Sequence, residues 1–217
     1  MLDQTAIAYG GLKKMDFKTD GKILVENVDN QLKDFTLVLI NTGGSHANLT
    51  SEYASIPNEM FSVAKFFNKN KLIEVDEKVF YDNLPSLTKS VNDRAILRAI
   101  HFFEENKRVD KICNALTNND YETFLSCIKK SGISSMIKLQ NCYVSGSVYQ
   151  PIPKALSVCE KFLNDGANRV HGGGFAGTIL NVVKNNELEY FIKNVSKIFG
   201  VDNVLPLKVR KIGTSVL

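Results

Sequence analysis

A run of glycines near the end of the chain is the clearest candidate for a site that acts on another molecule. Four glycines fall within six positions, at Gly172, Gly173, Gly174 and Gly177, and an apolar stretch follows them. Glycine is used where the backbone must take a positive φ or approach another group closely. The run therefore predicts a loop pressed against a ligand or a neighbouring segment. A tight turn packed only against its own domain is the alternative from composition.

The elements around this loop alternate between helix and strand. Apolar spacing predicts a helix over 152–163, which Gly166 caps, and a helix over 187–199, which Gly200 stops. The β-prone segments flanking these helices predict short strands at 168–171, 178–183 and 204–209. This order predicts an α+β fold, with helices packed on an antiparallel sheet in a ferredoxin-like split βαβ arrangement.

The first half of the chain changes period at about residue 50. Segments 14–17 and 23–28 have the pattern of a β-hairpin, and the continuous apolar run 35–40 predicts a strand covered on both faces. From residue 50 the three/four spacing of apolar residues predicts a bundle of helices. Its segments are 56–67, 76–84, 92–109, and a pair at 109–115 and 121–128 that breaks at 118–120.

Composition excludes several classes of protein. The 217 residues are 44% hydrophobic and carry a net charge of +4, which is too dilute for a nucleic-acid surface. No stretch is long and apolar enough for a membrane span or a signal peptide. The cysteines show no metal or redox spacing and are expected to be buried free thiols. The three histidines are equally unsuited to a metal site. We expect a cytoplasmic protein with no membrane or nucleic-acid partner and no metal ligands of its own.

The glycine run resembles the third signature motif of the GHMP kinases, most closely its galactokinase form, Arg-x-x-Gly-Gly-Gly-Phe-x-Gly. Arg169, the four glycines and Phe175 all match, whereas Ala176 and His171 replace residues common in the family. The resemblance covers nearly the whole chain but begins in the middle of a galactokinase. It implies that residues 1–41 are a remnant of the N-terminal kinase domain and that 42–217 form the C-terminal domain.

Two further matches imply roles in catalysis. Leu2-Asp3-Gln4 corresponds to a Met-Asp-Gln sequence in the active site of galactokinases, which makes Asp3 the expected catalytic base or orienter of the sugar hydroxyl. The segment from His46 to Tyr53 matches a His…Ser-x-Tyr sequence, which implies that Tyr53 contacts the sugar. Without the resemblance, Asp3 is interpreted as a helix cap or frayed terminus, and Tyr53 as a half-buried core residue.

Two other segments are interpreted as structural. Arg98-Ala99-Ile100-His101, with Glu105 and Arg108 behind it, matches a family pattern, and we expect His101 to make a structural hydrogen bond. Gln140-Asn141 lies where many galactokinases have Leu-Arg-Asp-x-Tyr, and the poor match assigns it no function.

The first two motifs of the family are absent, including the Gly-Leu-Ser-Ser-Ser loop that wraps the phosphates of ATP and helps to hold Mg²⁺. The resemblance therefore implies ATP and Mg²⁺ as cofactors of a full-length protein whose N-terminal half is missing from this chain. We expect the fragment alone to be inactive, with Asp3 mobile or displaced.

The leading hypothesis is transfer of the ATP γ-phosphoryl group to the anomeric hydroxyl of galactose or a related sugar. Alternatives are a GHMP kinase acting on an acetamido sugar or a non-sugar alcohol, and a non-catalytic sugar sensor. A basic module that binds RNA is disfavoured, because strand 178–183 has no aromatic residue for stacking.

Overall fold

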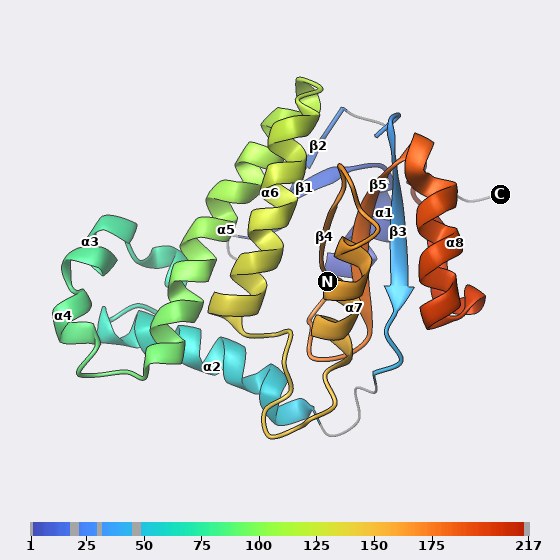
Figure 1. Ribbon diagram of the computed structural model, residues 1–217. Coiled ribbons are helices and arrows are strands. Elements are labelled where there is room, and N and C mark those ends of the chain that lie inside the picture. Colours follow the sequence, from blue (N-terminus) through green and yellow to red (C-terminus); the bar gives the residue numbers. More distant parts are fainter. Residues whose placement is uncertain (1, 18–21, 30–31, 45–48, 215–217) are drawn as a thin grey trace.

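The computed structural model describes residues 2–17, 22–29, 32–44 and 49–214. Figure 1 shows a sheet flanked by helices, with a helical part that extends away from it. The elements of the first half are α1 (Leu2–Tyr9), β1 (Lys13–Asp16), β2 (Leu24–Asn27), β3 (Phe35–Asn41), α2 (Thr50–Phe66), η1 (Leu72–Glu74), α3 (Glu77–Asp82) and α4 (Leu84–Leu87). Those of the second half are α5 (Asp93–Thr117), α6 (Tyr121–Ser134), η2 (Ser135–Leu139), α7 (Pro151–Glu160), β4 (Ala167–Val170), β5 (Thr178–Lys184), η3 (Asn185–Glu187), α8 (Leu188–Phe199), η4 (Val201–Asn203) and β6 (Val204–Leu207).

The main sheet has four antiparallel strands in the order β4-β5-β3-β6. Taken from β3 onward, this is the strand order of a ferredoxin-like split βαβ fold, so the predicted fold class is confirmed. The predicted hairpin also forms, because β1 and β2 pair with Lys13 opposite Asn27.

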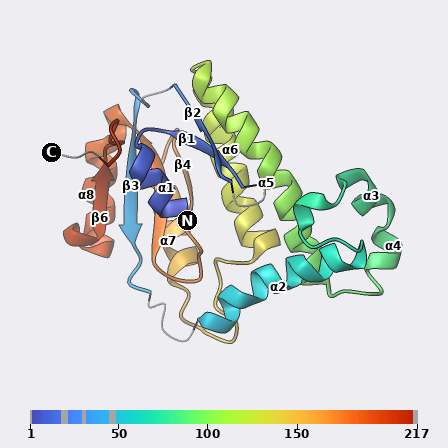
Figure 2. The same ribbon diagram turned by 180° about the vertical axis from the view of Figure 1, so that it is seen from behind.

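The period of two in β3 divides its side chains between two faces. Val38 and Ile40 are fully buried and share a core with Ile179 of β5, with α7 and with Phe191 of α8. Phe35, at the start of β3, packs in a second core with residues of α5 and α6. Seen from behind, α1 crosses this second side of the sheet (Figure 2).

The helical part carries its own core. Residues of α2, α3, α4 and α5 surround the buried Phe80, and α2 leads back from this core toward the sheet (Figure 1). The break predicted at 118–120 is confirmed, but α5 runs without interruption through 109–115. Asn92 and Asp120 cap α5 and α6, respectively, by accepting a hydrogen bond from a backbone N–H of the first turn.

One detail of the sequence-based description needs correction, and the division into two domains stays a prediction. Gly166 does not cap α7, which ends at Glu160; a Cβ on Gly166 would instead lie 2.5 Å from the carbonyl oxygen of Val182. The predicted boundary after residue 41 falls at the end of β3, and β3 lies between β5 and β6. Residues 35–41 thus belong to the same sheet as the C-terminal strands, because both edges of β3 pair with them. The origin of the preceding residues stays a prediction.

Candidate active-site loop

The glycine run forms the loop that joins β4 to β5. The hairpin closes where the backbone N–H of His171 donates to the carbonyl oxygen of Thr178 at 3.1 Å. Gly172, Gly174 and Gly177 have φ values of 70°, 83° and 87°, which only glycine adopts readily. Phe175 also has a positive φ, 58°, a rare conformation for a non-glycine residue that must be held by its surroundings.

Two side chains from outside the hairpin hold this loop. The hydroxyl of Tyr53, on α2, donates to the carbonyl oxygen of Gly174 at 2.7 Å. The amide Nδ2 of Asn141 donates to the carbonyl oxygen of Gly173 at 3.1 Å. The backbone carbonyl of Asn141 accepts a hydrogen bond from the N–H of Phe175 at 2.5 Å. These contacts leave no room for a side chain at position 174, because a Cβ on Gly174 would lie 2.1 Å from Asn141 O.

The loop has a buried half and an exposed half. Phe175 and Ala176 are 1% and 3% exposed and pack against Leu49, and the rings of Phe175 and Tyr53 meet edge to face at 5.2 Å. His171, Gly172 and Gly173 are exposed. The packing of the buried half restricts the backbone of the exposed half. The exposed backbone is accessible to a ligand.

The charge of Asp3 acts on His171, the first residue of the exposed half of the loop. Asp3 is an exposed residue of the first turn of α1, and its carboxylate is close enough to His171 to raise the pKa of that imidazole. Burial of the ring and the charge of Arg169 act in the opposite direction and dominate, so the pKa of His171 is lowered overall. Nδ1 of His171 lies 3.1 Å from the hydroxyl of Thr178. The predicted catalytic carboxylate is therefore within electrostatic reach of the start of the loop, which spacing in the sequence does not reveal.

Behind Tyr53, a cluster of charges ties α2 to α5. Arg98 is fully buried, and its Nη1 donates to Glu59 Oε2 at 2.8 Å and to Ser55 Oγ at 2.9 Å. Arg94 also binds Glu59, through Nε and Nη2. Burial lowers the pKa of Arg98 and Glu59 opposes this shift, which is the pattern expected for a guanidinium that is desolvated and paired.

A second cluster supports β4 from α5 and α6. Glu105 accepts hydrogen bonds from Arg108, from Ser131 and, at 3.4 Å, from Arg169, the residue that opens the glycine motif. His101 is 7% exposed, with Nδ1 2.9 Å from Ser134 Oγ, which confirms the structural hydrogen bond expected of it. Burial lowers the pKa of His101; the carboxylate of Glu105 raises it in part.

The described residues include no group of three or more His, Cys, Asp or Glu side chains placed to hold a metal ion. All four cysteines are free; three are buried, and Cys113 is half-buried. Within the same ranges, no helix has the length and hydrophobicity needed to cross a membrane.

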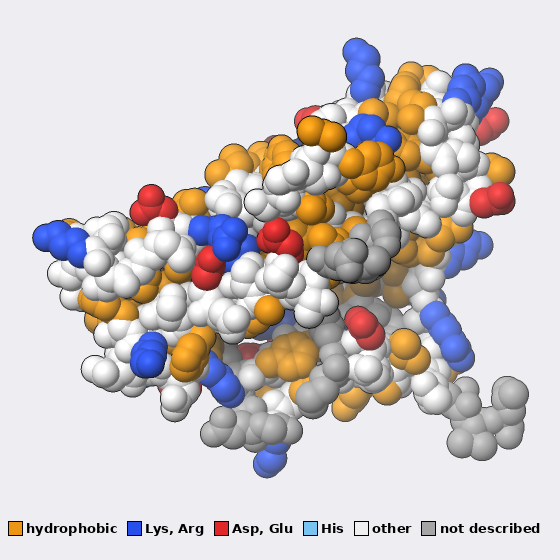
Figure 3. Space-filling model, turned by 90° about the horizontal axis from the view of Figure 1, so that it is seen from below, with side chains coloured by type: hydrophobic (Ala, Val, Ile, Leu, Met, Phe, Trp, Pro, Cys, Tyr) orange, Lys and Arg blue, Asp and Glu red, His pale blue; other side chains and the backbone are white. Residues whose placement is uncertain are grey.

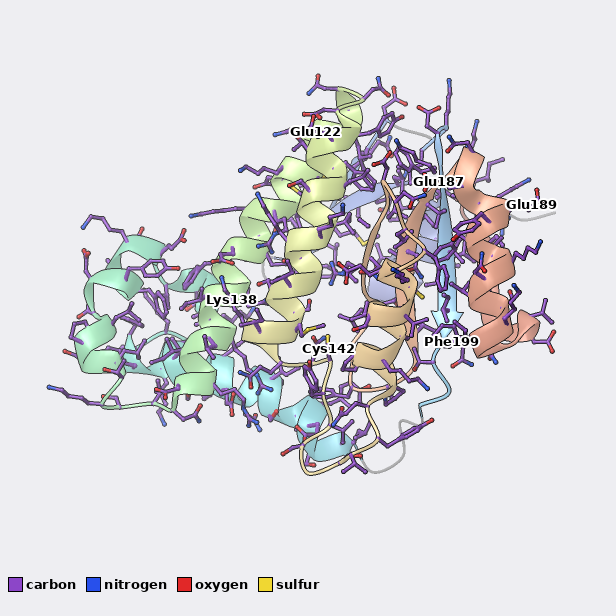
Figure 4. The ribbon with its side chains drawn as sticks, in the orientation of Figure 1. Glu122, Lys138, Cys142, Glu187, Glu189 and Phe199 are labelled. Atoms are coloured by element: carbon purple, nitrogen blue, oxygen red, sulfur yellow. The ribbon has the colours of Figure 1, made fainter. Side chains whose placement is uncertain are left out.

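Sequence reasoning placed some of these residues and missed one. Tyr53 reaches the loop, but the contact that the structure shows is with Gly174 and not with a ligand, so its role toward a sugar stays a prediction. His46, which begins the same sequence match, lies outside the described residues. Asn141 was given no function because its segment matches the family poorly, yet it makes two of the hydrogen bonds that hold the loop. Cys142, its neighbour, marks this connection between η2 and α7 in Figure 4.

Comparison with known proteins identifies relatives of this chain. No model of a protein family matches the sequence. The galactokinase of Limosilactobacillus reuteri is 30% identical over 208 residues, which cover 92% of this chain and 50% of that protein. The chain therefore spans about half the length of the curated relatives it matches.

Solved structures show the same fold. The Lactococcus lactis galactokinase, solved in complex with galactose, superposes with a TM-score of 0.76 at 20% identity, over 100% of this chain and 55% of that one. The L. major mevalonate kinase in complex with R-mevalonate superposes with a TM-score of 0.60 at 14% identity, over 98% of this chain and 53% of that one. In sequence and in fold, this chain corresponds to the C-terminal half of galactokinases, within the GHMP kinase family.

Proposed function

We propose that this chain is part of a sugar kinase that transfers the γ-phosphoryl group of ATP to the anomeric hydroxyl of galactose or a related sugar. The observation that supports the proposal is a glycine loop held by Tyr53 and Asn141, with the carboxylate of Asp3 within electrostatic reach of His171 at its start. A carboxylate next to a rigid, exposed backbone can orient a hydroxyl for attack on a phosphoryl group.

Each predicted site residue has a role in this proposal. Asp3 orients or deprotonates the sugar hydroxyl. The Tyr53 hydroxyl donates a hydrogen bond to the carbonyl oxygen of Gly174, so toward a sugar its phenolic oxygen would act as an acceptor. Gly172 and Gly173 present backbone to the substrates, while Gly174, Phe175 and Gly177 give the loop its shape.

ATP and Mg²⁺ belong to the proposed reaction of the whole protein. The described residues supply no metal cluster, and the sequence has no phosphate-wrapping serine loop, so further residues must bind the nucleotide. We therefore propose that the chain of 217 residues is inactive alone and acts with an N-terminal half like that of its relatives. We also propose a cytoplasmic location, where ATP is available.

The test is ADP release coupled to an optical readout, with ATP, Mg²⁺ and galactose. It is run on this chain and on a longer form that includes a galactokinase-like N-terminal half. Activity only in the longer form supports the proposal. In that form Asp3→Asn should lower kcat by at least 10²-fold, because it removes the base and keeps the shape. Asp165→Asn, an exposed carboxylate paired with Lys184, is the matched control.

Two outcomes would count against the proposal. Galactose binding by the longer form without ADP release would indicate a sugar sensor. ADP release with an acetamido sugar or a non-sugar alcohol, but not with galactose, would indicate a different acceptor.

A further inference from the structure

We propose that Arg98 is a positioning residue for the glycine loop, because both side chains that hold the loop depend on this one buried guanidinium. For its catalytic consequence the inference rests on the proposed function, but the structural claim concerns the loop itself. The hydrogen bonds of Arg98 go to residues outside the loop, so it acts through α2 on one side and through the segment after η2 on the other.

The first connection runs through α2. Nη1 of Arg98 binds Ser55 Oγ at 2.9 Å and Glu59 Oε2 at 2.8 Å. Both acceptors lie on the same helix as Tyr53, within about two turns of it. Ser55 follows Tyr53 by two residues and precedes Pro57, the proline inside α2, so the bond from Arg98 to Ser55 limits movement of the turn whose Tyr53 hydroxyl holds Gly174 O.

The second connection runs through η2. Nε of Arg98 donates to the carbonyl oxygen of Leu139, the last residue of η2, at 3.0 Å. The chain then turns sharply at Gln140, which has a φ of 57°, and delivers Asn141 to the loop. Lys138, seen at the lower end of α6 in Figure 4, binds Glu104 and fixes the preceding turn. Without the hydrogen bond from Arg98, Leu139 at the end of η2 is no longer connected to α5, and the position of the following Asn141 is less restricted.

Burial makes this arrangement stiff. The side chain of Arg98 is 0% exposed, so water cannot replace a bond that is lost. Lysine has one compact ammonium in place of the planar fork, so it cannot bind Ser55, Glu59 and Leu139 O in these directions.

Arg94 provides a matched control. It binds the same Glu59 from the same helix, and its hydrogen bonds all go to this carboxylate, not to Leu139 or Ser55. A substitution at Arg94 therefore weakens the tie between α5 and α2 while leaving the second connection intact. Asn141→Ala removes the side-chain hydrogen bond to Gly173 O directly. It shows how large an effect the loss of one loop-holding side chain has.

The experiment measures backbone amide exchange in the chain of 217 residues by NMR. Exchange of the Phe175 amide, which donates to Asn141 O, is compared with that of amides in the centre of β5. For Arg98→Lys and Asn141→Ala we expect Phe175 exchange to rise at least tenfold relative to β5. For Arg94→Lys we expect a change below twofold. Equal changes at Phe175 and in β5 for Arg98→Lys would show a general loss of stability and would overturn the proposal.

Kinetics of the longer form separate this proposal from the proposed function. If the longer form is a sugar kinase, Arg98→Lys should lower kcat more than it raises the KM for galactose, because a displaced loop misaligns bound reactants. An unchanged kcat beside increased Phe175 exchange would overturn the catalytic role of Arg98. If no form shows kinase activity, the proposed function fails, and the exchange data alone decide whether Arg98 positions the loop.

Discussion

The hydroxyl of Tyr53 donates to the carbonyl oxygen of Gly174 at 2.7 Å, across 121 positions of sequence. The contact joins the helical part of the molecule to the hairpin loop of the sheet. Burial raises the pKa of Tyr53, so the phenol keeps its proton and remains a donor at neutral pH. The face-to-edge contact of Tyr53 with Phe175 adds apolar packing to the hydrogen bond.

Replacing Tyr53 by Phe tests the hydrogen bond without the packing. The ring remains against Phe175, while Gly174 O loses a donor, so we expect a loss of about 1 kcal/mol in the free energy of unfolding. Urea denaturation followed by circular dichroism measures it. Tyr149→Phe is the control, because Tyr149 is 61% exposed. An equally small effect for both variants would show that the bond contributes nothing.

The glycine positions of the loop should differ in their tolerance of a side chain. Gly172 and Gly174 both have positive φ, but a Cβ on Gly172 meets nothing within 4 Å, whereas one on Gly174 meets Asn141. We expect Gly172→Ala to cost about 1 kcal/mol from backbone strain alone. Gly174→Ala should cost at least about 2 kcal/mol more, because the Asn141 segment must move. Equal free energies of unfolding for the two variants would contradict the fitted contact.

Glu59 should matter more than an exposed acid. Glu59→Gln leaves the buried Arg98 without its counter-charge, and we expect a loss of about 3–5 kcal/mol in stability. Asp82→Asn removes the partner of Lys78, in a pair whose side chains are 83% and 58% exposed, and should change stability within the error of the measurement. Thermal unfolding of the two variants at the same ionic strength decides between these expectations.

Stability should fall in mildly acidic solution because of His101. Burial lowers its folded-state pKa below the unfolded value of about 6.5, and Arg108 and Arg169 act in the same direction against Glu105. As pH falls below about 6.5, His101 becomes protonated in the unfolded chain but stays neutral in the folded chain. The free energy of unfolding therefore decreases until the pH reaches the folded-state pKa of His101.

The variant His101→Asn removes this titration. We expect the wild type to lose about 1 kcal/mol more than the variant between pH 7.5 and pH 5.5, measured by urea denaturation. His171→Asn is the comparison, since His171 also has a lowered pKa but lies in an exposed part of the loop. Parallel pH profiles for the wild type and His101→Asn would contradict the assignment.

Local patterns predicted most of the fold, and contacts across long distances account for what they missed. The strands and helices around the loop lie within a few residues of their predicted bounds, because apolar periodicity reports them directly. The apolar pattern of 35–40 predicts a strand covered on both faces, but a local pattern does not identify the strands that pair with it. The pairing of β3 with β5 and β6 was therefore not predicted. Gly166 looks like a helix cap in sequence, although its function is close approach to β5.

The site shows the same division. The glycine run, Asp3 and Tyr53 were found through their types and order. Asn141 holds the loop partly through its backbone carbonyl, which accepts from the N–H of Phe175. Every residue has such a carbonyl, so the residue type at position 141 does not predict this contact. The burial of Arg98 between α2 and η2 likewise depends on how helices cross, which spacing along one helix does not reveal.

The central place of β3 has a consequence for the order of events during synthesis. Val38 precedes Asn181 of β5 by 143 residues. The carbonyl oxygen of Val38 accepts a hydrogen bond from Nδ2 of Asn181. While the ribosome makes the intervening helices, the apolar β3 has neither neighbour and can pair with strands of other chains. The helical part, whose contacts are local, can condense early. In the folded molecule hydrophobic side chains are interspersed with charged and other polar ones on the face that Figure 3 shows. We therefore expect the nascent chain to need shielding of residues 35–41 until β5 and β6 emerge, and ribosome profiling of bound chaperone would detect it.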